Sequence, residues 1–352
     1  MKTITINKLP IPTWTWLKVN DRTVELNDYI SGVSPKIIDI PMEIEVDNEY
    51  HDFKNPDFLD MELGAGEGLG DLIRDCGAIS NCYRVKKGDK CQTALRLNVD
   101  YNDVDEASTA LSRLTFILED EAEMTCVIFF KGKSVSAIND IRIMAGKKAC
   151  LTLVEIFDLQ DDSTFVDSIG GNYDEKSGLK LTHVMKSQGD ISLGLASNLV
   201  GYKSYLDIDT GYLVKGNDKL DINYVSRHRG RLTDTKINVS GVLRDTAKKT
   251  FRGTIDFIKG CKDATGDERE DVLLMDPGVH NNTVPLILCA EEDVEGAHGA
   301  SIGKISDEIL FYLQARGIPE EQINELMAKS RIDAVIGRIS DEATRAELLG
   351  NE

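Results

Sequence analysis

The stretch TFRGTIDFI at residues 250–258 alternates apolar and polar side chains, which is the pattern of a β-strand with one buried face. The same alternation occurs in KINVSGV at 236–242 and in TALRLNV at 93–99, and more apolar runs occupy 114–118 and 124–130. Turn signals at 146–147, 170–172 and 215–218 separate such runs. Because helical periodicity is almost absent from about 83 to 288, the chain is predicted to have an all-β body.

An all-β body of this kind is a sandwich, a barrel, a propeller or a β-solenoid. No clear sequence repeat is visible, which argues against propellers with signature motifs. The strand pattern alone does not separate a sandwich from a solenoid. By the pattern of apolar, polar and turn-forming residues, the chain divides into an irregular, mixed N-terminal region at 1–84, a β core at 85–302 and a helical C-terminal region at 303–352.

The C-terminal region carries strong helix signals. Ser306 is a predicted N-cap, Leu310 and Leu313 have helical spacing, and Gly317 is placed to end the helix. A second apolar stripe at Ile323, Leu326 and Met327 predicts a further helix, and a third begins after residue 340. These helices either cap the β body or present a face to another protein.

Charge and composition exclude several classes of function. The 352 residues carry 41 basic and 60 acidic side chains, so the net charge is −19, which disfavours nucleic acid as a partner. No apolar run approaches the ~20 residues that a membrane helix needs. The first ten residues lack the pattern of a signal peptide, so a cytoplasmic protein without a disulfide framework is expected, its seven cysteines remaining thiols.

No phosphate-binding loop is present. The run 132–134 ends like a Walker A motif, but Val127 stands where the leading glycine is required. The glycine-rich run 64–68 lacks the lysine. The chain is therefore predicted to bind no nucleotide directly.

Residues 259–303 contain many side chains that can bind metal ions. Cys261, Cys289, His280 and His298 fall within this segment together with several carboxylates, and thiolate and imidazole suit iron and zinc. His298 is flanked by Ala297 and Gly299, which leave its ring accessible. From the residues alone, His298 is either a ligand or a structural, hydrogen-bonded histidine.

The same segment resembles a known family. AHGASIG at 297–303, followed by ILFYLQARGI at 309–318, is similar to the C-terminal signature of the SufB/SufD family, the scaffold subunits of the SUF iron–sulfur cluster assembly machinery. FRG at 251–253, residues 281–285 and the step 292–294 also match. The resemblance implies a right-handed parallel β-helix core with helical terminal regions.

The resemblance also implies partners. A SufC-type ABC ATPase is expected to dock on the C-terminal helices, which fits the missing phosphate-binding loop. The residues expected to contact it are Ile309, Phe311, Tyr312, Leu313 and Arg316. The short chain indicates a compact variant, working with a sulfur donor as a homodimeric scaffold or as one half of a heterodimer with a SufB/SufD paralogue.

For the site, the resemblance places His298 at the histidine position of the SufD-type motif, while Glu270 stands where SufB-type proteins carry an interface cysteine. Cys261 lies upstream and can replace that thiol. The hypothesis is that a transient iron–sulfur cluster is built at a dimer interface between His298, Cys261 and a carboxylate, Glu292 or Glu270. Cys289 is a further thiol candidate, although the apolar run before it favours an inward core position.

Two alternatives remain at this point. The chain can be a structural, SufD-like partner without a cluster of its own. It can also be a carbohydrate-active β-helix enzyme using carboxylates such as Asp207, Asp209 and Asp221 for acid–base work, although such enzymes act without a partner and are usually exported.

Overall fold

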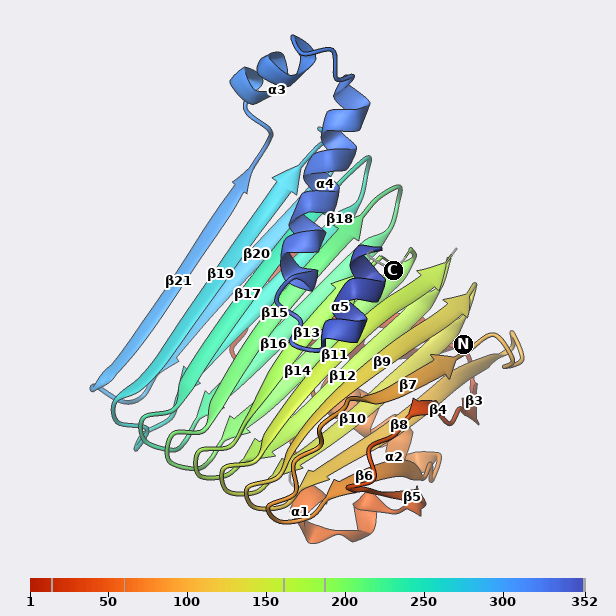
Figure 1. Ribbon diagram of the computed structural model, residues 1–352, viewed down its shortest axis with the longest axis vertical. Helices are drawn as coiled ribbons and strands as arrows, with labels where there is room; N and C mark the ends of the chain where they lie inside the picture. The colour runs from red at the N-terminus through yellow and green to blue at the C-terminus, as the bar shows by residue number, and fades with distance from the viewer. Residues whose placement is uncertain (14, 60, 161, 187, 351–352) are drawn as a thin grey trace.

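The computed structural model describes residues 1–13, 15–59, 61–160, 162–186 and 188–350. The chain is 52% strand and 15% helix and forms a parallel β-helix of about eight turns, which confirms the predicted fold. Successive long strands alternate between two sheets, so that each strand pairs in parallel with the strand two places later in the chain. Figure 1 shows the strands stacked side by side from the N-terminal to the C-terminal end of the molecule.

The first sheet, sheet 1, contains the even-numbered strands of the β-helix and two N-terminal strands. Its members are β5 (Ile44–Tyr50), β6 (Ser80–Val85), β8 (Ser108–Leu118), β10 (Ser136–Ala145), β12 (Thr164–Tyr173), β14 (Asp190–Leu199), β16 (Lys219–His228), β18 (Lys248–Phe257), β20 (His280–Cys289) and β3 (Tyr29–Gly32), which pairs with β8.

The second sheet, sheet 2, contains the odd-numbered strands of the β-helix and the N-terminal strand β4. Its members are β4 (Lys36–Asp39), β7 (Leu95–Asp100), β9 (Glu123–Lys133), β11 (Cys150–Gln160), β13 (Gly178–Met185), β15 (Tyr205–Val214), β17 (Asp234–Leu243), β19 (Ala264–Leu274) and β21 (Val294–Gly303). The five predicted strand runs lie within or overlap β7, β8, β9, β17 and β18.

The core lies between the two sheets, because alternate side chains of every strand point inward. Its centre is a stack of aromatic rings: the centroids of Phe130 and Phe157 lie 5.2 Å apart, and Phe165 of sheet 1 lies 5.6 Å from Phe130. All three side chains are fully buried. Stacked rings of this kind add to the apolar area that each turn buries against its neighbours.

The turns from sheet 1 to sheet 2 also stack. In six successive turns one residue adopts a left-handed conformation although none of the six is glycine: Glu121, Lys148, Lys176, Lys203, Leu232 and Asp263. Each donates its backbone N–H to a carbonyl of the next turn, as from Lys148 to Glu175 at 2.7 Å. These bonds compensate for the strained backbone and fix the spacing of the turns.

The predicted turn at 170–172 is wrong, because Gly170 and Gly171 lie inside β12. A Cβ on Gly170 would lie 2.5 Å from the carbonyl oxygen of Glu62, and one on Gly171 would overlap the Tyr173 hydroxyl. Gly170 therefore allows close approach of the N-terminal region and Gly171 makes room for the Tyr173 side chain, and neither changes the chain direction.

The N-terminal region packs on the outer face of sheet 1. It contributes the hairpin β1 (Lys2–Ile6) and β2 (Arg22–Leu26), the short helices η1 (Thr15–Leu17), η2 (Asp52–Lys54) and α1 (Pro56–Leu59), and α2 (Glu67–Asp75). Gly64 meets Gly194 of β14 so closely that a Cβ on Gly194 would lie 2.5 Å from the Gly64 carbonyl carbon. The glycine-rich run 64–68 therefore allows the two backbones to approach closely. This role does not require the lysine of a phosphate-binding loop, which the run lacks.

The C-terminal region consists of α3 (Asp307–Gln314), α4 (Glu320–Ile336) and α5 (Glu342–Leu349). The Ser306 side chain accepts the Ile309 N–H and Gly317 is left-handed, as predicted. Ile332 and Ile336 of α4 pack with outward-facing valines of sheet 2. Within the described residues, no helix has the length and apolar character needed to cross a membrane.

Candidate functional site

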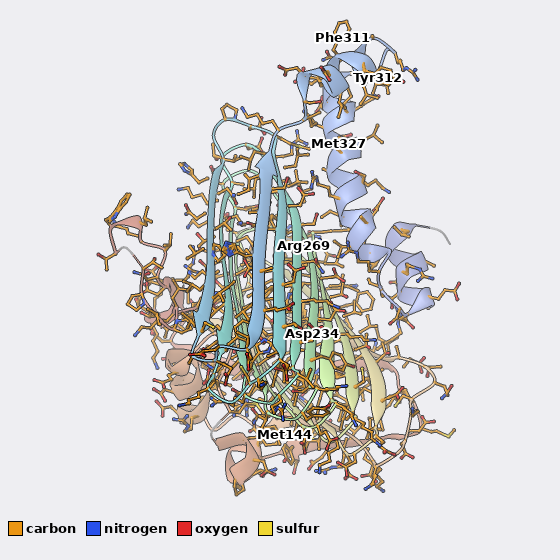
Figure 2. All side chains as sticks on the ribbon, turned by 90° about the vertical axis from the view of Figure 1, so that its left-hand side faces the viewer. Met144, Asp234, Arg269, Phe311, Tyr312 and Met327 are labelled. Carbon is orange, nitrogen blue, oxygen red and sulfur yellow. The ribbon has the colours of Figure 1, made fainter. Side chains whose placement is uncertain are left out.

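The β-helix ends in an uncovered turn. Strands β20 and β21 are the last members of sheets 1 and 2, and Figure 2 views the molecule from this side, with the C-terminal helices flanking the sheets. Their register with β18 and β19 identifies the inward-facing side chains, here called the open rung: Asn281, Thr283, Pro285, Ile287, Cys289, Val294, Gly296, His298, Ala300 and Ile302. All are exposed or half-buried, because no further turn packs on them.

His298 lies in the middle of the open rung. It is exposed and is the register partner of Glu268 in β19, so the two side chains lie side by side on the inner face. Glu268 is buried, and burial, with the neighbouring Glu270, raises its pKa to about 8. A Cβ on Gly253 would overlap the Glu268 carboxyl group, so this glycine makes room for it. His298 thus has an acidic neighbour directly beneath the open surface.

Sequence reasoning missed Glu268. Residues 264–274 alternate, with Gly266, Glu268 and Glu270 on the buried face, so the period-2 pattern that predicted other strands could have placed Glu268 beside Glu270. Charged side chains at inward positions obscured that pattern.

Glu270 is held by other groups. Its carboxylate forms an ion pair with Lys249 of β18 and accepts a hydrogen bond from the Thr283 hydroxyl at 2.6 Å. The Lys249 and Glu270 side chains are 0% and 1% exposed. Both carboxylate oxygens are therefore engaged inside the β-helix, one turn below the open rung.

The two candidate thiols differ. Cys261 is buried with Phe257, Ala264 and Ile287, and burial raises its pKa to about 11, which disfavours the thiolate. Cys289 is exposed and donates to the carbonyl oxygen of Glu291 at 3.0 Å. Cys289 does face inward as expected, but its expected burial in the core is wrong, because the described β-helix ends at this rung and leaves the side chain exposed.

The turn joining β20 to β21 carries the remaining candidate. Glu292 is exposed in this turn, next to Glu291, whose carboxylate accepts the backbone N–H of Gly260 at 2.9 Å. That bond is the main cause of the lowered pKa of Glu291. Cys289 and Glu292 therefore lie at one corner of the open rung, near the buried Cys261.

His298 is not part of that corner, because it lies four residues beyond the start of β21, or about 13 Å at ~3.3 Å per residue. Among the described residues, three close histidine, cysteine or carboxylate ligand atoms meet only in the interior of the β-helix, at Glu155, Asp167 and His183. The described residues of the open rung therefore do not bring together three ligand atoms for a single metal ion.

Four of the five predicted partner-binding residues lie on α3, and Arg316 follows two residues after its end. Phe311 and Tyr312 are 73% and 54% exposed, and Ile309 and Arg316 are exposed as well, while Leu313 is half-buried. The Arg316 guanidinium lies 4.3 Å from the Tyr312 ring centroid. Figure 2 shows Phe311 and Tyr312 beyond the ends of the strands. The apolar residues predicted to form one face of α4 differ in burial: Ile323 is buried, whereas Leu326 is 56% exposed.

The carboxylates of the enzyme alternative do not meet. Asp207 and Asp209 face outward from β15 in sheet 2, whereas Asp221 faces outward from β16 in sheet 1. Asp221 accepts hydrogen bonds from Arg252 at 2.7 Å and from Asn7 at 2.8 Å. A glycosidase needs two facing carboxyl groups, and this set does not provide them.

Comparison with known proteins agrees with the fold. Residues 101–331 match the family described as SUF system FeS cluster assembly, SufBD core domain. The chain is 24% identical over 208 residues to the iron–sulfur cluster assembly protein SufD of Bacillus subtilis, covering 59% of this chain and 48% of that protein. It is 23% identical over 267 residues to SufB of the same organism, covering 71% and 54%.

A third relative, a SufBD family protein of Staphylococcus saprophyticus, is 29% identical over 106 residues, which cover 30% of this chain and 23% of that protein. The matches to SufD and SufB span about half the length of those proteins. With a parallel β-helix over the matched residues and more than half of the chain aligned, this chain belongs to the SufBD core-domain family of the SUF iron–sulfur cluster assembly system.

Proposed function

We propose that the chain is a cytoplasmic scaffold subunit on which iron–sulfur clusters are assembled de novo, together with a SufC-type ABC ATPase. The observation that carries this proposal is the open rung. It exposes the imidazole of His298 and the thiol of Cys289 on the inner face of an unfinished β-helix. Imidazole and thiolate are ligands that suit iron.

The open rung pairs with a second subunit, either another copy or a SufB/SufD paralogue. The outer backbone edges of β20 and β21 end both sheets and are free to meet a second pair of strands. The single chain does not gather three close ligand atoms at this end of the described structure. Pairing supplies the missing ligands, and we favour the homodimer because one chain already contributes both a thiol and an imidazole.

The cluster is cargo, built from iron and a donor's sulfur and then transferred. His298 and Cys289 are the accessible ligands, and Glu292 supports Cys289 from the neighbouring turn. Cys261 and Glu270 join the ligand set only when the last turns rearrange, because both side chains are buried. ATP-driven movement of the partner ATPase provides that rearrangement.

The ATPase docks on α3 and the turn that follows it, through Ile309, Phe311, Tyr312, Leu313 and Arg316. Two large aromatic side chains exposed on α3 and an exposed arginine just after it have the composition of an interface centre. The ATPase activity resides in the partner, and the present chain acts as an assembly protein.

The test is anaerobic reconstitution with ferrous iron and sulfide after co-purification with the ATPase, followed by iron and sulfide analysis. His298→Ala and Cys289→Ala are expected to lower bound iron and sulfide at least severalfold. The matched control is His280→Ala, which removes an exposed histidine at an outward position of β20. Undiminished loading in both variants refutes the proposed ligands.

A second candidate function is that of a SufD-like structural subunit without its own cluster. The burial of Cys261 and the engagement of Glu270 favour it, because they leave one accessible thiol at the open rung. Under this alternative the wild-type chain binds the ATPase and a paralogous subunit but retains no iron when reconstituted alone.

A further inference from the structure

A second cluster of metal-ligand side chains lies inside the β-helix, away from the open rung. Glu155 of β11 and His183 of β13 are register partners in sheet 2, and Asp167 of β12 faces them from sheet 1. One ligand atom of each lies within 4.8 Å of the others. Exposure of the three residues is 0–1%, and the surrounding core is aliphatic and aromatic.

The two carboxyl groups have no cationic partner among the described residues. Three other deeply buried carboxylates do: Asp140 and Asp221 pair with arginine and Glu270 pairs with Lys249. By contrast, one oxygen of Glu155 (Oε1) and one of Asp167 (Oδ2) lack any hydrogen-bond partner. A buried charge without a partner is costly, so this site requires either a cation or protons.

The remaining atoms of the cluster are held in place by neighbours. The Nδ1 atom of His183 lies 2.7 Å from the Tyr224 hydroxyl, so Nε2 faces Glu155, at 2.8 Å from Oε2. Oδ1 of Asp167 accepts from the Asn139 amide at 2.7 Å. Partners of this kind orient metal ligands in proteins, because they fix the tautomer of the imidazole and the rotation of the carboxylate.

Protonation describes the metal-free state. The 2.8 Å contact between Nε2 of His183 and Oε2 of Glu155 is then a hydrogen bond, which requires a proton between the two atoms. A metal ion displaces such a proton when it binds, and neutral imidazole is the form that binds it.

We propose that Glu155, Asp167 and His183 bind a divalent first-row transition-metal ion inside the β-helix. One nitrogen and two carboxylate oxygens favour Zn²⁺, Fe²⁺ or Mn²⁺ over Ca²⁺ or Cu⁺. Bonds of ~2.0–2.2 Å place ligand atoms up to about 4 Å apart, so the cluster needs only a small contraction. Because the site is sealed, the ion enters while the chain folds.

This ion is separate from cluster assembly. Strand β13 lies four strand spacings from β21 in sheet 2, or about 19 Å at ~4.8 Å per spacing. The ion joins both sheets at the middle of the β-helix and cross-links turns that otherwise meet through apolar packing. Its role is therefore to stabilise the folded chain.

The test uses the full chain unfolded in denaturant with a chelator and refolded anaerobically with Co²⁺ alone, then passed through gel filtration. Wild-type protein is expected to retain stoichiometric cobalt with visible d–d absorption. Asp167→Asn and His183→Gln should retain at least roughly tenfold less. His280→Ala, which removes an exposed histidine that belongs to neither proposed site, should retain as much as wild type.

A variant that fails to fold is recognised by circular dichroism. In that case the proposal is tested on the wild-type chain alone. Native mass spectrometry and thermal unfolding with and without Co²⁺ should show one bound ion and a higher melting temperature. A refolded wild-type chain without retained cobalt overturns the proposal and leaves the cluster neutralised by protons. Full retention by both cluster variants overturns it as well, because the metal then binds elsewhere.

Discussion

Replacing Lys249 by Met should weaken the C-terminal end of the β-helix. The change removes the ammonium group and keeps most of the side-chain volume, so the Glu270 carboxylate is left buried with Thr283 as its remaining partner. Breaking a buried ion pair from one side costs about 3–5 kcal/mol. Solvent reaches the open rung one turn away, so we expect the lower end of this range, about 3 kcal/mol. This corresponds to roughly a 150-fold shift in the equilibrium for local unfolding of the last turns.

The loss should be local, because each turn of a solenoid contacts only its neighbours. Hydrogen exchange followed by mass spectrometry should therefore show faster exchange in peptides from β18 to β21 and unchanged exchange in β8 to β11. The double variant Lys249→Met/Glu270→Gln removes both charges and keeps an acceptor for the Thr283 hydroxyl. Its opening free energy should return to within about 1 kcal/mol of the wild type.

Two outcomes would refute this reasoning. If Lys249→Met changes exchange in β19 by less than about threefold, the pair is more hydrated than its burial indicates. If the double variant is as unstable as the single one, the loss comes from the packing of the lysine stem and not from the unpaired carboxylate.

Three further predictions concern other parts of the fold. Gly194→Ala places a methyl group 2.5 Å from the Gly64 carbonyl carbon, so the N-terminal region should shift outward at a cost of about 1–3 kcal/mol; limited proteolysis should cleave before β6 sooner, and an unchanged cleavage rate contradicts the contact. Burial lowers the pKa of His228 from 6.5 to about 4, so the folded state binds fewer protons than the unfolded state, and the contribution of His228 to stability is complete above pH 6.5 and lost as the pH falls to 4. His228→Gln should flatten the acid side of the curve of unfolding free energy against pH, and equal slopes would exclude this histidine as a cause. Asp52→Asn leaves the buried guanidinium of Arg113 with less countercharge and should lower the free energy of unfolding in urea by about 3 kcal/mol; a change below 1 kcal/mol would show that the neighbouring groups compensate.

The strands could be predicted from the sequence, but the solenoid required the family resemblance. Alternation at 236–242 and 250–258 is visible because the inward side chains there are mostly apolar. The structural repeat is visible in the turns between the two sheets. There, a small buried residue follows each residue with a left-handed backbone: Ala122, Ala149, Ser177, Ser204, Thr233 and Ala264. Their spacing varies from 27 to 31 residues and their identity varies among three types, so no clear sequence period results.

The candidate site was predictable in part. His298 and Cys289 were identified by residue type, and both are accessible at the open rung. The burial of Cys261 could not be read from the sequence, because it depends on how the last two turns pack. The interior cluster was also hidden, since Asp167 belongs to a different sheet from Glu155 and His183 and only the stacking of turns brings them together.

The number of stacked turns sets the length of the β-helix. Each turn adds ~4.8 Å along the axis, so the seven strand spacings between β6 and β20 in sheet 1 hold the first turn and the open rung about 34 Å apart. Because the hydrogen bonds between turns repeat with nearly the same geometry, an insertion or deletion of one whole turn changes this distance by one step and leaves the chemistry of both ends intact. The length of the β-helix can therefore vary independently of the residues at its two ends.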